Sequence, residues 1–369
     1  MNESNSIHFY AMALTLAKGI GPVLARKLVQ ICGSPEAVFG ESSKALESIS
    51  GIGVNRIKQL QDKSIFSKAE AELKLCKDRG WLIHYIGEST YPRRLKQIDS
   101  APLILFQKGR ADLNPVRSLA MVGSRRITEA GQGFVEEFLR DLKAYTPHII
   151  SGLAYGVDAQ SHRHALKNKL ETIAVLAHGL NMVYPKLHRQ LAENIIDQGG
   201  ALVSEYCSES LLAKENFPKR NRIIAGMADA IVVAEAANRG GALITAQYAN
   251  DYNRDVFAVP GKPGDRNRDG CNLLIKSHRA HLLEKAQDLS YILRWEPQKS
   301  DSAAWSKAKL SPTEQAIVEA LSLDTKVKDL DTLSLETSIE SPELLSRLCL
   351  MELQGWIKVL PGNRFRLIN

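Results

Sequence analysis

Short apolar runs alternate with segments of helical periodicity between residue 118 and about residue 295. Apolar strands separated by helices form a parallel sheet covered on both faces, so the pattern predicts an α/β fold with a doubly wound sheet. In such a sheet the functional residues gather where the strands end. The predicted strands are Leu119–Gly123, Ile149–Gly152, Thr172–Ala177, Ala201–Glu205, Ala230–Ala234 and Val256–Val259.

Residues 1–90 contain a repeat that predicts a separate helical domain. Gly19-Ile20-Gly21 and Gly51-Ile52-Gly53 lie 32 residues apart, and a helical pattern follows each of them. Gly-hydrophobic-Gly between helices is typical of the helix-hairpin-helix (SAM-like) unit, whose backbone amides can contact phosphates without reading bases. Lys or Arg at 26, 27, 56 and 58 favours such a contact. The alternative is that the hairpins only pack against each other or against another protein.

The remaining segments predict a central domain over 91–295, a linker and a third domain. Residues 91–117 form a connector with one strand, Leu103–Phe106, before the main sheet. Residues 296–310 are polar and contain Pro and Ser, which is typical of a linker. Residues 311–369 show two helix starts and then a strand pair, which predicts a winged-helix-like domain.

The two helix starts of this third domain carry capping signals. Ser311 can cap the first helix, with Pro312 at its first position and Glu314 completing a capping box. Ser341-Pro342-Glu343 repeats the signal, and strands are expected at Trp356–Val359 and Arg364–Ile368. The second helix has one arginine against two glutamates, whereas a helix that reads a DNA groove needs more positive charge. We expect this domain to contact protein, or to have no essential contact.

The composition is that of a globular cytoplasmic protein. Hydrophobic residues make up 44% and charged residues 24% of the chain, and the net charge of +7 is compatible with a polyanionic partner. The apolar run at 11–17 is too short to span a bilayer, so no membrane contact is expected. An odd number of scattered cysteines argues against disulfides and zinc. The cysteines are Cys32, Cys76, Cys207, Cys271 and Cys349.

The first central strand ends in the sequence Gly123-Ser124-Arg125-Arg126, and a helical segment from Thr128 to Tyr145 follows. At such a corner the first amides of the helix are unpaired, so the corner attracts anions, and two arginines suggest phosphate. A dinucleotide site would need a second glycine where Arg125 stands, and no GxxxxGK[ST] is present. NAD binding and a P-loop are therefore not expected.

A second basic stretch follows Phe217-Pro218. It holds Lys219, Arg220, Asn221 and Arg222 in the first turn of a predicted helix. Cations there oppose the helix dipole, a cost that a bound anion would offset. Phe217 is placed to stack on a base. The alternative is a solvated basic face beside a packed phenylalanine.

Three further strand ends offer glycines or cations. Gly240, Gly241 and Thr245 open one helix and make a second candidate anion cradle. Gly152 and Gly156 belong to another loop, which Asp158 can cap or orient. The loop after Val259 carries Lys262, Arg266 and Arg268. Four such strand ends make a long groove that suits a polymer better than a small molecule.

Catalytic signals are weaker. Four histidines fall in one half of the sheet, and Glu205 ends a strand, yet no HExxH, GxSxG or paired-carboxylate spacing is present. We interpret these residues as structural, and expect neither catalytic residues nor a metal site. The histidines are His162, His164, His178 and His188.

Six motifs in order over residues 90–290 resemble the DNA-processing protein A family (DprA, also called Smf). They are GSRR, SGLAYGVDAQSHRHAL, FPKRNRIIAGMADAIVVAEAA, GGALITAQYA, DVFAVPG and GCNLLI. The resemblance implies a Rossmann-like domain that binds single-stranded DNA without a nucleotide cofactor. It also implies protection of incoming DNA in natural transformation, loading of the RecA recombinase, and a homodimer formed through the Rossmann-like domain.

The resemblance also implies contacts and departures. The Gly-Ser-Arg motif falls on Gly123, Ser124 and Arg125, with Arg125 a phosphate contact. The basic motif falls on Lys219, Asn221 and Arg222, with Lys219 the second contact. Ser-Gly-Ser is usual before Leu-Ile-Thr-Ala, whereas Gly240 and Ala242 replace the serines here, which leaves only backbone donors. Ser277-His278-Arg279 stands where a glycine is usual, near the implied dimer surface.

We therefore interpret the chain as a non-enzymatic single-stranded DNA-binding protein. The rival is a nucleotide or sugar-phosphate hydrolase of the lysine-decarboxylase-like phosphoribohydrolase type. Such enzymes carry a Pro-Gly-Gly-x-Gly-Thr-x-x-Glu loop, of which residues 238–243 keep only the glycine pair, and Gln247 lies nearest to the position of the catalytic Glu. A purely structural adaptor would leave the strand-end cations unexplained.

Overall fold

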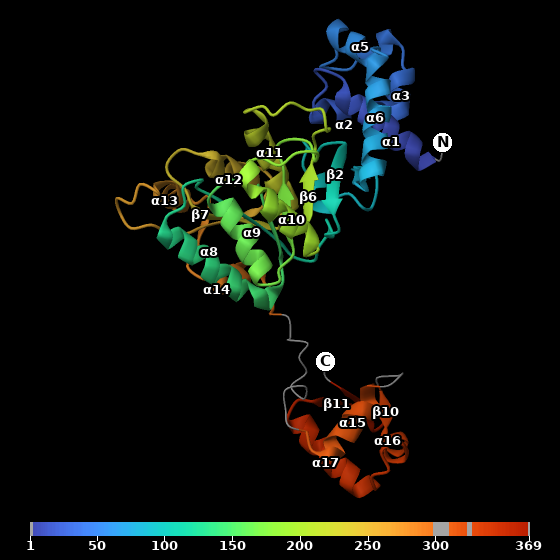
Figure 1. The fold of residues 1–369 in the computed structure, drawn as a ribbon, viewed down its shortest axis with the longest axis vertical. Coiled ribbons are helices and arrows are strands. Elements are labelled where there is room, and N and C mark those ends of the chain that lie inside the picture. The colour runs from blue at the N-terminus through green and yellow to red at the C-terminus, as the bar shows by residue number, and fades with distance from the viewer. Residues whose placement is uncertain (1–2, 298–309, 323–326, 368–369) are drawn as a thin grey trace. The chain divides into compact units, whose positions relative to one another are not determined.

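The computed structural model describes residues 3–297, 310–322 and 327–367, and the chain forms two compact units (Figure 1). The first unit ends at Glu296 and the second begins at Pro297. Most of the predicted linker, residues 298–309, lies outside the described residues. The predicted domain boundaries, including the one at residue 90, stay predictions.

A nine-stranded sheet organises the first unit, with the strand order β1-β2-β6-β5-β4-β3-β7-β8-β9. In this spatial order each strand is parallel to the next from β6 through β5, β4, β3, β7 and β8 to β9. The strand β2 is antiparallel to both of its neighbours, β1 and β6. The strands are β1 (Leu82–Tyr85), β2 (Ile104–Gly109), β3 (Ser118–Gly123), β4 (His148–Ser151), β5 (Thr172–Val175), β6 (Ala201–Ser204), β7 (Ala230–Glu235), β8 (Asp255–Ala258) and β9 (His281–Leu282).

The predicted doubly wound α/β fold is confirmed, and every predicted strand of the sheet is found within a few residues. Two edge strands were not predicted, β1 and β9. In β1 the first residue is exposed and only the last two are buried, and β9 has two residues, both exposed. Neither carries the buried apolar run that identified the central strands.

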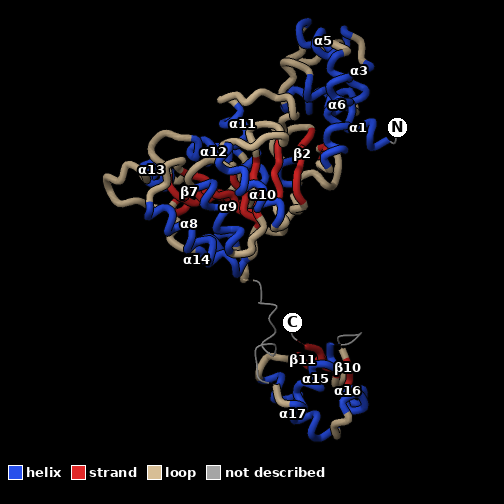
Figure 2. Tube along the Cα trace, viewed as in Figure 1, coloured by secondary structure: helices blue, strands red, loops and turns tan. Residues whose placement is uncertain are grey.

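The strand β3 shows how the sheet separates two cores. Leu119 and Met121 belong to one buried cluster, while Ala120 and Val122 belong to the other, because successive side chains point to opposite faces. Helices therefore cover both faces (Figure 2). They are α7 (Arg93–Lys96), α8 (Glu129–Leu142), α9 (Val157–Lys167), α10 (Arg189–Asp197), α11 (Asn216–Met227), α12 (Gly241–Asp251), α13 (Asp269–Lys276) and α14 (Ala286–Leu293), with short 3-10 turns η1 (Lys143–Tyr145) and η2 (Lys186–His188).

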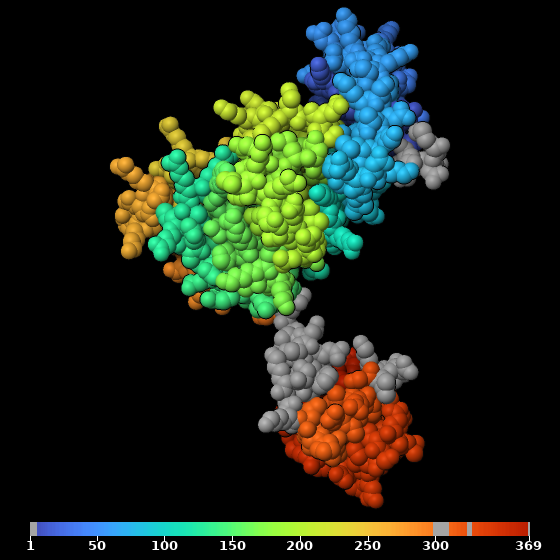
Figure 3. All heavy atoms as spheres, viewed as in Figure 1, coloured from blue at the N-terminus to red at the C-terminus, as the bar shows by residue number. Residues whose placement is uncertain are grey.

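The N-terminal helices share a continuous hydrophobic core with the sheet. Polar contacts also join the two parts: His8 Nε2 lies 2.9 Å from Glu88 Oε1, and the Ser208 amide donates to Glu72 Oε1 at 2.8 Å. In the space-filling view their atoms meet without a visible break (Figure 3). The helices are α1 (Glu3–Leu16), α2 (Pro22–Cys32), α3 (Pro35–Gly40), α4 (Ser43–Glu47), α5 (Val54–Leu60) and α6 (Ser64–Arg79).

The Gly-Ile-Gly repeat forms two turns that face each other through a cation. Each turn places its first glycine at positive φ, Gly19 at 79° and Gly51 at 95°. Arg56 donates to both turns, to Gly19 O at 3.0 Å and to Gly51 O, and Lys27 Nζ donates to Ser50 O at 2.8 Å. These contacts give the cations an internal role, which supports the interpretation that the hairpins pack against each other.

Within its described residues, 310–322 and 327–367, the second unit has three helices and a three-stranded sheet of order β10-β12-β11, as predicted for a winged helix. Leu321, Leu333, Leu344, Leu348 and Phe365 are buried in its core. The helix α16 was not predicted. The elements are α15 (Pro312–Ser322), β10 (Lys328–Asp329), α16 (Leu330–Thr337), α17 (Ser341–Leu353), β11 (Ile357–Leu360) and β12 (Arg364–Leu367).

One of the two predicted helix caps in this unit is confirmed. The Ser311 amide donates to Glu314 Oε2 at 2.7 Å, and the Glu314 amide donates to Ser311 Oγ at 3.3 Å, which completes a capping box. The second prediction is wrong, because α17 begins at Ser341 itself and Glu340 occupies the N-cap position without a side-chain hydrogen bond. A proline at the second helical position allows this earlier start.

Within the described residues all five cysteines are free thiols, and three of them, Cys76, Cys207 and Cys271, are buried. No cluster of three His, Cys, Asp or Glu side chains that could hold a metal ion occurs in the same part of the chain. None of the helices described there is long and apolar enough to cross a bilayer.

Candidate nucleic-acid interface

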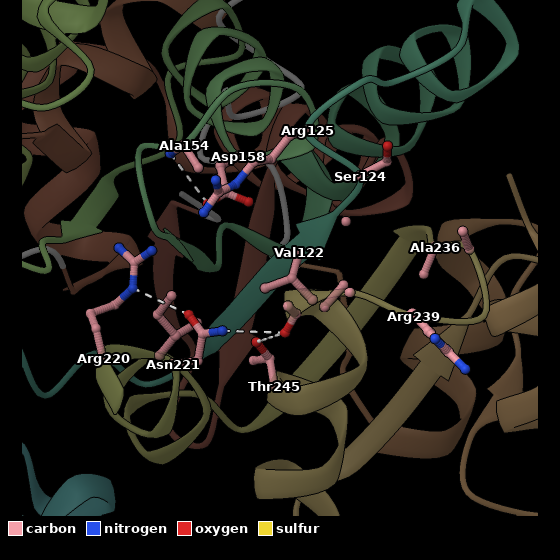
Figure 4. Close-up of a pocket in the computed structure, with 16 residues that line it drawn as sticks. Val122, Ser124, Arg125, Ala154, Asp158, Arg220, Asn221, Ala236, Arg239 and Thr245 are labelled. Atoms are coloured by element: carbon pink, nitrogen blue, oxygen red, sulfur yellow. Dashed lines mark hydrogen bonds between the residues drawn. The ribbon is translucent and has the colours of Figure 1, made fainter. Parts of the chain in front are cut away.

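A pocket of about 370 Å³ lies where the order of the sheet reverses, at the carboxyl ends of β3 and β7 (Figure 4). Such a reversal point is where open α/β sheets bind ligands. We call it the strand-end pocket. Its wall includes Gly123, Ser124, Arg125, Asp158, Arg220, Asn221, Arg239, Gly240, Gly241 and Thr245.

The loop after β3 holds Arg125 and Arg126 at the surface because its backbone is fixed below them. The Ser124 amide donates to Glu235 O at 2.7 Å, and Ser124 O accepts from the Val157 amide at 3.1 Å. This crossing needs Gly156, which has φ 74° and whose Cβ, if present, would lie 2.0 Å from Ser124 O. Both arginines are exposed, and Arg125 lines the strand-end pocket.

The expectation that the first amides of α8 attract an anion is wrong. A buried carboxylate already occupies this helix start: Glu235 accepts from the Thr128 amide at 3.2 Å and from Thr128 Oγ1 at 2.5 Å. Thr128 Oγ1 in turn accepts from the Gly131 amide at 3.1 Å. Glu235 thus places a negative charge beside the start of α8, and this charge disfavours a second anion there.

The helix α12 has the open start instead. Its N-cap residue is Gly240, and no side chain caps its first amides. Gly240 and Gly241 are exposed and line the strand-end pocket. Thr245 is buried, and its hydroxyl donates to Gly241 O at 3.1 Å, so it supports the helix start. Uncapped amides at the positive end of a helix favour a bound anion here.

Arg220 lies at the floor of the pocket and is almost fully buried. It donates to Gly152 O at 2.7 Å and to Val175 O, and its Nε donates to Asn221 Oδ1 at 3.3 Å. Burial lowers the pKa of Arg220 to about 10, opposed by the charge of Asp158, so it stays a cation at neutral pH. A Cβ at Gly152 would lie 2.4 Å from the guanidinium, which explains the glycine.

Asn221 connects this cation to α12. While its Oδ1 accepts from Arg220, its Nδ2 donates to Gly241 O at 3.2 Å (Figure 4). Asp158 orients the loop after β4 as predicted, because its carboxylate accepts from the amides of Gly152 and Ala154 at 3.1 and 3.3 Å. Burial raises the pKa of Asp158, and Arg220 opposes that shift.

Arg222 points away from this arrangement into a buried ion pair. Its Nη2 donates to Glu205 Oε2, and the two side chains are only 9% and 10% exposed. Burial raises the pKa of Glu205, and the adjacent Arg222 opposes the shift. The structure thus gives Arg222, interpreted from the sequence as a phosphate contact, a carboxylate partner of its own, and it gives Glu205 a structural contact.

A second hollow of about 830 Å³ adjoins the strand-end pocket and shares Arg125, Asn221 and Arg239 with it. We call it the aromatic groove. The ring of Phe217 lines it, with the Arg125 Cζ 5.7 Å from the ring centroid. The ring of Tyr184 meets Phe217 edge-on at 5.6 Å between centroids.

Among the charged and aromatic lining residues, three were not singled out from the sequence: Arg239, Tyr184 and Lys214. Arg239 had a usable signal, since it is a cation in a strand-end loop beside Gly240. Tyr184 and Lys214 had none, because they follow β5 and β6 at some distance along the chain. Tertiary folding alone brings them to the groove.

Three other predicted residues stand outside both hollows. Lys219, Lys262 and Arg126 are exposed, but none of them lines the strand-end pocket or the aromatic groove. Gly152 is buried, with its amide on Asp158 and its carbonyl on Arg220, so it offers no backbone donor.

The histidines hold structure. His188 is bonded to Leu153 O at 2.8 Å, and His164 lies 4.0 Å from Glu136. The Thr172 hydroxyl donates to Ile149 O, so at His162, 2.7 Å away, Nδ1 must be the donor. Burial lowers the pKa of His162 to about 3.

Comparison with known proteins gives consistent matches. Residues 82–294 match the family model for DNA recombination-mediator protein A, and residues 301–363 match the DprA winged helix domain. Protein Smf of Synechocystis sp. is 36% identical over 78% of this chain and 73% of its own. Protein Smf of Escherichia coli is 34% identical over 84% of each chain.

Solved structures share the fold. DNA processing protein A (DprA) from Streptococcus pneumoniae aligns with a TM-score of 0.65 and 31% identity over 78% of this chain and 98% of that chain. DNA processing protein A from Helicobacter pylori, solved for its single-stranded DNA binding mode, aligns with a TM-score of 0.53 over 58% of this chain and 97% of that chain. At 23% identity the latter shows the fold alone.

The ion pair of Arg222 predicts a stability effect. Arg222→Ala should lower the free energy of unfolding by about 3–5 kcal/mol, because Glu205 would stay buried without a partner. Urea unfolding measures the loss. Arg125→Ala is the matched control, with a change within about 0.5 kcal/mol because Arg125 is exposed. Replacing both partners, Arg222→Met with Glu205→Leu, should recover much of the loss. Equal losses for Arg222→Ala and Arg125→Ala would contradict this assignment.

His162 predicts a dependence of stability on pH. Its pKa in the folded chain, about 3, is below the ordinary value of 6.5, so the unfolded chain binds the proton more readily. Stability should therefore fall as the pH is lowered from 6.5 towards 3, by at most about 1.4 kcal/mol per pH unit for one proton. His162→Asn keeps a donor for Thr172 but cannot titrate, so its unfolding midpoints should fall less steeply over this window. An unchanged pH profile would refute the assignment.

Proposed function

Because the chain belongs to the DNA recombination-mediator protein A (DprA/Smf) family, we propose that it binds single-stranded DNA across the strand-end pocket and the aromatic groove. The observation that carries the proposal is the joining of two features in one continuous hollow. Arg125, Arg239 and the uncapped start of α12 offer contacts to phosphates, and the Phe217 ring beside them offers a face to a base.

We propose two groups of site residues. The first group is exposed or half-buried and contacts DNA: Gly123, Ser124, Arg125, Arg126, Phe217, Lys219, Gly240, Gly241 and Lys262, with Arg239 added. A second group supports the site without contacting DNA, because its polar atoms already bind other protein groups: Gly152, Arg220, Asn221, Arg222 and Thr245. Buried Arg220 holds the Gly152 carbonyl and Asn221 in place behind the pocket.

Family membership also supports finer proposals about biological role. We propose that the protein acts in the cytoplasm, protects incoming DNA in natural transformation and loads RecA onto it. We further propose that it forms a homodimer through its Rossmann-like domain.

We propose that this role is non-enzymatic, against the phosphoribohydrolase alternative. Gln247, nearest to the position of the catalytic glutamate in those enzymes, bonds Asp251 at 2.7 Å. Asp158 is the carboxylate in the strand-end pocket, and it is buried and accepts two backbone amides. Glu205 is buried against Arg222. Asp158 and Glu205, the two candidate carboxylates, are therefore both engaged in structural contacts.

The direct test is fluorescence anisotropy of a labelled oligonucleotide, single-stranded and then duplex, across a salt series. Single-strand binding should exceed duplex binding and weaken as salt rises, because phosphate contacts release counterions. Weak and equal binding to both forms would reject the proposal. A screen of nucleotides for hydrolysis would then test the rival.

Removing the exposed cations should weaken binding without unfolding the protein. We predict that Arg125→Ala with Lys219→Ala lowers single-strand affinity at least about tenfold and flattens the salt dependence, since phosphate contacts are lost. The melting temperature should stay nearly unchanged. Arg140→Ala, an exposed arginine on α8, is the control and should bind normally. Wild-type affinity in the double variant would refute the groove assignment.

The second unit should be dispensable for this binding. A chain that ends at Glu296 keeps the whole first unit and both hollows, so its single-strand affinity should stay within about threefold of the full chain. Side-by-side anisotropy measures it. A loss beyond tenfold would move part of the DNA site to the winged-helix unit.

A further inference from the structure

Exposed aromatic side chains gather near the strand-end pocket. Among the residues that the structure describes, the exposed tyrosines are Tyr155, Tyr184 and Tyr291. Tyr155 follows β4 and Tyr184 follows β5, so two of the three stand at the carboxyl ends of adjacent strands, and each is 43% exposed. The third, Tyr291, belongs to α14.

Tyr184 is held in place by its backbone. Its amide donates to Nε2 of buried His178 at 3.2 Å, and Nδ1 of that imidazole is bonded to Gly179 O at 2.9 Å. Burial lowers the pKa of His178, which keeps the acceptor nitrogen unprotonated. The ring is therefore presented from a fixed loop, so stacking on it costs little ordering.

In the aromatic groove, the side chains of Arg125, Phe217 and Tyr184 form a row. The Arg125 guanidinium lies 5.7 Å from the Phe217 centroid, and Tyr184 meets the same ring edge-on at 5.6 Å with an interplanar angle of 62°. Because Arg125 and Tyr184 both pack against Phe217, the exposed face of Tyr184 is the open aromatic surface of this row. A base stacked there would have its phosphate on the Arg125 side.

Tyr155 continues the row over β4. Its ring packs against His188 at 5.0 Å between centroids, and His188 is anchored by a 2.8 Å hydrogen bond to Leu153 O. Residues 184–189 run from Tyr184 past His188, and Lys186 and Arg189 in this segment are exposed cations. Cations interleaved with aromatic rings are the composition of a single-strand path.

On the other side of the strand-end pocket, the loop after β8 offers positive charge but no exposed aromatic ring for a base to stack on. Past β8 the loop holds Lys262 and Arg266, both exposed, but none of the exposed aromatic residues named above lies there. Phosphates can be attracted to either side, whereas unpaired bases gain only where a π face is open.

We propose that Tyr184, followed by Tyr155, is a base-stacking track that leads the single strand from the strand-end pocket over the ends of β5 and β4. The inference rests on the proposed single-strand binding and adds its direction and two stacking residues. The partner is an unpaired polynucleotide of any sequence, because every base has a π face.

The test uses the full chain with oligonucleotides that contain 2-aminopurine, whose emission is quenched by stacking. Tyr184→Leu keeps an apolar contact with Phe217 but removes the π face, so affinity should fall about five- to a hundredfold and quenching should be lost. Tyr184→Phe keeps the ring and should lose far less. Tyr291→Ala, the control, should bind like the wild type.

Salt and length separate the track from the phosphate contacts. Tyr184→Leu should leave the salt slope unchanged, whereas Arg125→Ala should lower it by about one. Tyr155→Ala should weaken only oligonucleotides long enough to pass Tyr184. Failure of the wild type to bind single strands would reject the proposed function itself. If Tyr184→Leu keeps the wild-type affinity and quenching while Arg125→Ala still binds more weakly, only the stacking track is rejected. Tyr184 would then serve only its contact with Phe217 or a contact with another protein.

Discussion

The buried guanidinium of Arg220 fastens together the strand ends on which the site is built. It donates to the carbonyls that follow β4 and end β5, Gly152 O and Val175 O, and through Asn221 it reaches the start of α12. Its charge is balanced by buried Asp158, which organises the same β4 loop. A buried cation must find such partners, since burial without them costs several kcal/mol. The partners it requires are the loops that shape the strand-end pocket.

This constraint divides the cations of the basic stretch into two kinds. In one helical turn, Arg220 and Arg222 are buried on protein acceptors, while Lys219 is exposed. The difference follows from the position along α11, because Pro218 and Lys219 in its first turn are exposed, whereas from Arg220 to Met227 every residue except Asn221 is buried. The buried arginines of the basic stretch therefore stabilise the fold, and Lys219 contributes charge at the surface. Fewer cations of this stretch can contact DNA directly than the sequence suggests.

The same logic governs the two helix starts beside the pocket. The carboxylate of Glu235 on β7 accepts from the amide and the hydroxyl of Thr128, the N-cap residue of α8, and its backbone carbonyl accepts from the Ser124 amide. These bonds hold the loop before the helix with Arg125 outward. The start of α12 has no such partner and remains open towards the hollow. The start of α8 is thus occupied by a carboxylate of the protein and helps to position Arg125. The start of α12 is free to face the phosphate that we propose binds there.

Local periodicity and short motifs were enough to determine the doubly wound sheet, its central strands and the capping box at Ser311, because these depend on neighbours in the chain. They also identified the strand-end loops, since parallel strands must end at one edge of the sheet. They did not determine which loop amides stay free, which arginines are buried, or that Tyr184 meets Phe217. Those properties depend on contacts between residues such as Glu235 and Thr128, which lie far apart in sequence, so only the tertiary structure decides them.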